Sequence, residues 1–189
     1  MRPRWLAGLL VALPLAGAAT DLQPCLACHG KAGQSTLPLT PSLGGQPSFF
    51  VVSQLFLFRE ARRDDATMAA VAKSMSDGDL RAYAEAVAQL PPPAAPAGGR
   101  DPARYARGEA LAAQHKCNIC HSADFSGQQQ VPRLANQRED YLLKALREFK
   151  GGERKGYGGA MAVELMPVDP AGIADLAHFL AQFTPGSQR

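Results

Sequence analysis

Three features that would assign this chain to a familiar class of protein are scarce in its sequence. The 20 Lys and Arg residues nearly balance the 17 Asp and Glu residues, so a net charge of +3 gives no indication of a nucleic-acid-binding protein. No apolar run, including the one near the N-terminus, is long enough to cross a membrane. There are only four cysteines, and the surrounding sequence lacks the strand periodicity expected around a redox-active Cys-x-x-Cys site.

All four cysteines lie in two five-residue motifs, CLACH at residues 25–29 and CNICH at residues 117–121. Two thiols at this spacing can add across the vinyl groups of one haem, and the adjacent imidazole can then bind the iron. A structural zinc site would not require a His after each second Cys, and a disulfide would leave both His residues without a role. The motifs therefore predict two covalently bound c-type haems. The predicted attachment positions are Cys25, Cys28, Cys117 and Cys120. The predicted proximal iron ligands are His29 and His121.

Residues 1–19 have the pattern of a secretory signal peptide. Arg2 and Arg4 precede an apolar run, small residues follow it, and cleavage after residue 18 or 19 satisfies the small-residue rule. The alternative is an uncleaved anchor, but the run contains Pro14 and is too short to span a bilayer. Export would place the chain in an oxidising compartment, so haem attachment must precede disulfide formation.

The rest of the chain consists of two repeats, a first copy at residues 20–90 and a second copy at residues 100–189. A proline-rich linker at residues 91–99 joins them. After each haem motif comes a matching phrase, PSLGGQ in the first copy and PRLANQ in the second. Helices are expected next at residues 48–62 and 139–150, followed by a short irregular stretch and a closing helix. This order predicts an all-α fold in which each small domain folds around its haem.

Methionine is the expected second axial ligand of an electron-transfer haem, and the closing helices locate one in each copy. Ser76 and Asp169 are good N-caps for these helices, and Met68 and Met161 stand at equal distances before them. We therefore predict Met68 and Met161 as the distal iron ligands. Met166 is the rival in the second copy, although the first copy has no methionine at the equivalent position.

Two prolines and two further histidines lie near the candidate sites. Pro41 and Pro132 follow the haem motifs, and each carbonyl is a natural acceptor for the outer N–H of the axial His. A proline that only stiffens its loop is the alternative. His115 lies too close to its own motif to reach the distal face, and His178 lies on the closing helix, so ligation by two His residues has no support.

The two haem motifs, the Pro-x-Leu-x-x-Gln phrases, Met68 and Met161 together resemble class I cytochromes c in tandem, of the dihaem c-four type. The resemblance covers essentially the whole chain after the leader. It implies two low-spin haems with His and Met ligands, a pseudo-twofold arrangement, and single-electron transfer in the bacterial periplasm. Related dihaem domains also serve as electron-accepting subunits of dehydrogenases.

The two copies differ at one expected helix crossing. The second copy begins with a predicted helix that Asp101 caps, Pro102 starts and Gln114 ends, and in it Gly108 is expected to pack against the aromatic ring of Phe179. The first copy has no room for such a helix between the leader and Cys25, and Ala86 stands where the second copy has its aromatic residue.

The middle helix of the first copy is apolar on almost every side over residues 49–58. Phe56 and Leu57 stand where the second copy has Arg147 and Glu148. A helix that is apolar all round is normally buried all round. We therefore expect this face to be covered by the second copy or by another chain, as a dimer or subunit contact.

Two functions fit these features. The first is a periplasmic carrier of single electrons between respiratory complexes, for example from a quinol-oxidising complex to a terminal oxidase or reductase. The second is the haem subunit of a stable dehydrogenase or reductase complex, which the apolar face would favour. A dihaem peroxidase would need an iron with an open site, and two Met ligands argue against it. We predict redox-protein partners, membrane contact only through them, no nucleic-acid binding, and no enzymatic activity of the chain itself.

Overall fold

The computed structural model describes residues 20–96, 99–154 and 159–184, and their regular structure is helical apart from one isolated bridge. This confirms the predicted all-α fold. The predicted leader and linker residues 97–98 lie outside the described residues. No helix in the described part is both long and apolar enough to span a membrane. The helical elements are α1 (Gln23–His29), η1 (Lys31–Gly33), α2 (Ser48–Arg59), α3 (Ala66–Ala72), α4 (Asp77–Ala88), α5 (Pro102–Gln114), α6 (Cys117–His121), α7 (Glu139–Lys150), α8 (Ala160–Leu165) and α9 (Pro170–Ala181).

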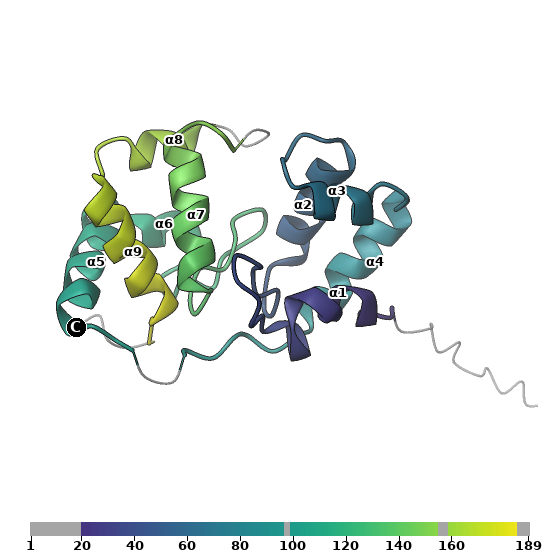
Figure 1. Ribbon diagram of the computed structural model, residues 1–189, viewed down its shortest axis with the longest axis horizontal. Helices are drawn as coiled ribbons and strands as arrows, with labels where there is room; N and C mark the ends of the chain where they lie inside the picture. Colours follow the sequence, from purple (N-terminus) through teal and green to yellow (C-terminus); the bar gives the residue numbers. More distant parts are fainter. Residues whose placement is uncertain (1–19, 97–98, 155–158, 185–189) are drawn as a thin grey trace, which may run out of the picture.

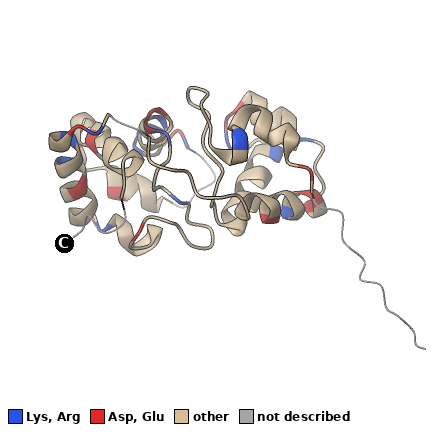
Figure 2. Ribbon diagram, turned by 90° about the horizontal axis from the view of Figure 1, so that it is seen from below, with Lys and Arg blue, Asp and Glu red and all other residues tan. Residues whose placement is uncertain are grey.

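The helices gather in two groups, α1–α4 in the first copy and α5–α9 in the second, with an extended segment running between them (Figure 1). Within the first group α2 packs against α3 and α4, and within the second α9 packs against α5 and α7. Acidic and basic residues are distributed over the helices of both groups (Figure 2).

The second copy is organised around the predicted crossing of α5 and α9. A Cβ atom added at Gly108 would lie 2.2 Å from the carbonyl oxygen of Asp175 and 2.6 Å from the Cβ atom of Phe179. Only glycine therefore allows the two helix backbones to approach this closely. Phe179 is fully buried and contacts the rings of Tyr105 and Phe125 edge-on, which confirms its predicted place in the crossing.

The first copy has a much smaller protein core. Val51, Ala84 and Val87 form its cluster of buried apolar residues, whereas the second copy buries an extended set that includes four aromatic rings. The described part of the first copy before α1 contains only residues 20–22, so nothing there takes the place of α5. Ala86 is partly exposed on α4. The first copy therefore depends more heavily than the second on burial against its cofactor.

Two details of the predicted helices are wrong. The middle helix of the first copy ends at Arg59 and not at residue 62, because Ala61 adopts a left-handed conformation with φ of 50°. The stretches that carry the two candidate methionines are short helices, α3 and α8, and not irregular segments. Asp65 caps α3 by accepting a hydrogen bond from the N–H of Met68, at 2.9 Å.

Candidate haem-binding sites

The first haem motif lies in α1, which ends at a buried histidine. His29 is 7% exposed, and its Nδ1 atom lies 2.8 Å from the carbonyl oxygen of Pro41. A carbonyl oxygen only accepts hydrogen bonds, so Nδ1 carries the proton and donates it, and the lone pair is left on Nε2. This confirms the predicted proline acceptor and gives His29 the tautomer that binds iron through Nε2.

The second motif, in α6, repeats this geometry. The Nδ1 atom of His121 donates a hydrogen bond to the carbonyl oxygen of Pro132 at 2.9 Å, and the imidazole is 5% exposed. Burial lowers the pKa of His29 and of His121, and outweighs the opposing effect of the proline carbonyls. Both imidazoles are therefore held in the neutral form, which is the form that coordinates a metal.

The cysteines of each motif are free thiols, one partly buried and one exposed. Each pair stands three residues apart on one helix and therefore shares a face. Burial raises the pKa of the Cys25 and Cys117 thiols. None of the four thiols forms a disulfide. A c-type haem requires two thiols and a neutral imidazole, so the residues present fit this group.

The candidate distal methionines lie on equivalent short helices. Met68 is partly buried in the first turn of α3, and Met161 is partly buried in the first turn of α8, where it packs against the core of the second copy. The rival Met166 follows the end of α8 and is 68% exposed. Neither His115 nor His178 extends the sites: His178 is 1% exposed and bonds Glu139 in the packing of the second copy.

The matching phrases have a second role that their sequence similarity did not predict. Gln46, at the end of the first phrase, hydrogen-bonds the backbone of Arg133 in the second copy. Gln137, at the end of the second phrase, hydrogen-bonds the backbone of Ser42 in the first copy. The recurrence of Gln at one position in both copies was the sequence signal that could have predicted these contacts. A buried amide needs hydrogen-bond partners on both its oxygen and its nitrogen.

Further polar contacts join the two copies beside these glutamines. Arg138, just before α7, donates to the carbonyl oxygen of Ser35, and Asp140 accepts from the N–H of Leu39. On the side of α2, Arg63 donates to the hydroxyl of Tyr141 at 2.8 Å. The first copy is thus held against the second by bonds at several separate points.

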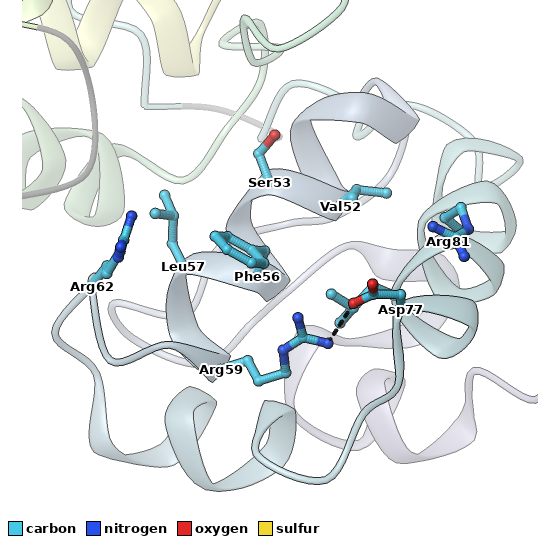
Figure 3. A pocket seen from close by; sticks show the side chains of 9 residues that line it. Val52, Ser53, Phe56, Leu57, Arg59, Arg62, Asp77 and Arg81 are labelled. Atoms are coloured by element: carbon cyan, nitrogen blue, oxygen red, sulfur yellow. Dashed lines mark hydrogen bonds and ion pairs between the residues drawn. The ribbon is translucent and has the colours of Figure 1, made fainter.

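The apolar face at residues 49–58 is only partly covered within the chain. Leu57 is 8% exposed and points away from the ion pair of Arg59 with Asp77, as Figure 3 shows. Phe56 is 38% exposed and Phe49 is 57% exposed. Phe56 lines an open groove of about 500 Å³ between α2 and α4, where Arg59 stacks over its ring. Leu57 is therefore buried within the chain, whereas Phe56 remains exposed.

Comparison with known proteins agrees with this geometry. The family model described as Cytochrome c matches residues 105–184. Cytochrome c4 of Thiocapsa roseopersicina is 34% identical over 89% of this chain and 93% of its own length. A thiosulfate dehydrogenase electron acceptor of Thiomonas intermedia (strain K12) is 30% identical over 75% of this chain and 69% of its own. The solved structure of Acidithiobacillus ferrooxidans cytochrome c4 superposes with a TM-score of 0.76 at 27% identity, and covers 86% of this chain and 100% of that one.

Proposed function

Since this chain belongs to the cytochrome c4 family and is a dihaem electron-transfer cytochrome, we propose that it carries single electrons between respiratory complexes in the periplasm. The electrons would pass from a quinol-oxidising complex to a terminal oxidase or reductase. The observation that carries the proposal is the pair of equivalent sites, each with a neutral buried imidazole beside two free thiols. The charge and apolar pattern of residues 1–19 supports export. We also propose two domains, at residues 20–90 and 100–189, joined by the linker at 91–99.

The chain's own residues would hold each haem on both faces. The haem would supply an iron that exchanges one electron, and Cys25 with Cys28, or Cys117 with Cys120, would hold it through thioether bonds. His29 and His121 would bind the iron through Nε2. We propose Met68 and Met161 on the distal side, because both lie in the first turn of a short helix at the same place in their copies. A thioether is a soft neutral ligand that favours the reduced iron and suits an electron carrier. With both axial positions taken, we propose no enzymatic activity for the chain alone.

Exchanging the methionines of the second copy tests this ligand assignment. Met161→Ala is expected to remove one haem's share of the weak near-infrared absorption that a thioether bound to oxidised haem iron gives, because Met161 supplies that bond. Met166→Ala, just after the same helix, is the matched control and is expected to keep the band, since the side chain of Met166 is 68% exposed. Loss of the band in Met166→Ala with its retention in Met161→Ala would assign the ligand to Met166.

A second candidate function is the haem subunit of a stable dehydrogenase or reductase complex. The observation that favours it is the exposure of Phe49 and Phe56 on α2, of which Phe56 lines the groove between α2 and α4. Similarity to a protein named as a thiosulfate dehydrogenase electron acceptor points the same way. In this role residues 49–58 would form the contact with the partner subunit.

One experiment separates the carrier from the subunit. The wild-type protein purified gently from its native periplasm is expected to elute as a single chain with two haems if it is a carrier, and in a larger complex if it is a subunit. Phe56→Arg introduces the residue of the second copy at a partly exposed position, so the free energy of unfolding should change by no more than about 0.5 kcal/mol. A larger complex that Phe56→Arg dissolves would establish the subunit role, whereas a single chain in both proteins would establish the carrier.

A further inference from the structure

Each copy has one buried glutamine that hydrogen-bonds the backbone of the other copy near its haem site. Gln137 donates from Nε2 to the carbonyl oxygen of Ser42 and accepts from the N–H of Ser42 through Oε1, both at 2.8 Å. Gln46 makes the reciprocal pair with the backbone of Arg133, both at 3.0 Å. The glutamines are 4% and 6% exposed, so these bonds are shielded from water. The arrangement is a pseudo-twofold one, since each glutamine ends the same phrase of its copy.

The hydrogen bonds reach the axial histidines through a single peptide group. The carbonyl of Pro41, which accepts from His29, and the N–H of Ser42, which donates to Gln137, belong to the same peptide unit. The second copy has the same relay: the peptide between Pro132 and Arg133 accepts from its axial histidine and donates to Gln46. Each peptide group is therefore held by a histidine of its own copy at one end and by a glutamine of the other copy at the other end.

Hydrogen bonds joined in this way polarise one another, by roughly 10–30% per bond. When the N–H of Ser42 donates to Gln137, electron density moves toward the carbonyl oxygen of Pro41, which becomes a better acceptor for the N–H of His29. A stronger bond at Nδ1 makes Nε2 the more basic ligand. A more basic axial ligand stabilises the oxidised iron, which carries the higher charge, and so lowers the reduction potential.

We propose that each glutamine is a positioning residue for the haem of the other copy. Gln137 lowers the reduction potential of the haem bound by His29, and Gln46 lowers that of the haem bound by His121. Docking of the copies thereby sets both potentials through the protein backbone. This role goes beyond electron carriage as such and holds for a carrier and for a subunit alike.

The surroundings of the two glutamines allow either one to be removed without parting the copies. The side chains of Arg138 and Asp140 also hold the loop of the first copy, through Ser35 and Leu39, although the N–H of Arg138 shares the Oε1 atom of Gln137. The bond between Arg63 and Tyr141 lies on the side of α2. A substitution at one glutamine should therefore remove its own polarising bond while the interface persists.

The test is a crossover of two variants of the holoprotein. Gln137→Leu removes the acceptor for Ser42, so the haem of the first copy should become easier to reduce, with roughly a threefold change in its reduction equilibrium. Gln46→Leu should do the same to the haem of the second copy. Redox titration followed by NMR resolves the two haems and also reports the chemical shift of each histidine Nδ1–H, which should move only in the copy opposite the substitution. Gln89→Leu, at the exposed end of α4, is the matched control and should move neither haem.

Several outcomes would overturn the proposal. Equal shifts of both haems, a shift confined to the copy that carries the substitution, or a lowered potential would each show that the glutamine acts only through packing or water access. Unchanged potentials would show that the glutamine influences neither haem. If a leucine variant does not fold, Gln137→Asn and Gln46→Asn replace it, since each keeps an amide that is one methylene short of its partner. Each should likewise shift only the haem of the opposite copy.

Discussion

Replacing Cys25 and Cys28 with serine is expected to leave one covalent haem on the chain and to unfold α1–α4. The first copy has a small protein core, formed by Val51, Ala84 and Val87, and lacks an opening helix among its described residues. The covalent haem supplies the apolar surface that such a core cannot, so its loss removes the basis of folding in this copy. Intact mass and haem staining of a denaturing gel give the haem count, and far-UV circular dichroism gives the helix content.

The reciprocal variant, Cys117→Ser with Cys120→Ser, is the matched control. It should also retain one haem, but it should keep more helix, because α5, α7 and α9 share an extended core that includes Phe125 and Phe179. A wild-type mass equal to that of the bare polypeptide would refute the two covalent attachments outright. Equal loss of helix in both double variants would refute the stated difference between the cores.

Sequence alone was sufficient where a local rule fixes the structure. The Asp-Pro pair at 101–102 predicted the start of α5, and Ser76 predicted the cap of α4, because capping depends only on neighbouring residues. The proline acceptors at 41 and 132 were also predictable, since an axial His needs a partner for its outer N–H and a loop of fixed length supplies one.

The remaining features depend on contacts between distant residues. The bonds of Gln46 and Gln137 join positions that only the docking of the copies brings together, so no local pattern contains them. The burial of Leu57 beside an exposed Phe56 is of the same kind, because it depends on where the chain bends after α2. Helices as short as α3 and α8 are stabilised by packing and not by propensity, which explains why their sequences suggested irregular structure.

The crossing of α5 and α9 leaves no room for a side chain at position 108. Gly108→Val is expected to destabilise the second copy by about 3 kcal/mol or more, because its first added carbon would lie 2.2 Å from the carbonyl oxygen of Asp175 and 2.6 Å from the Cβ atom of Phe179. Both atoms belong to buried residues of α9, so α5 can relieve the overlap only by moving off the core. Chemical denaturation of the holoprotein, followed by near-UV circular dichroism and by haem absorbance, measures the loss.

Gly78→Ala is the matched control, since Gly78 is also a helical glycine. A Cβ atom there would meet only the hydroxyl oxygen of Ser76, at 3.5 Å, which is an ordinary contact. Alanine is the better helix former by about 0.5–1 kcal/mol, so this variant should be as stable as the wild type or slightly more stable. If Gly108→Val unfolded at the wild-type denaturant concentration, α5 and α9 would not cross as closely as Gly108 allows. If Gly78→Ala were equally destabilised, the cost would come from the glycine backbone and not from the crossing.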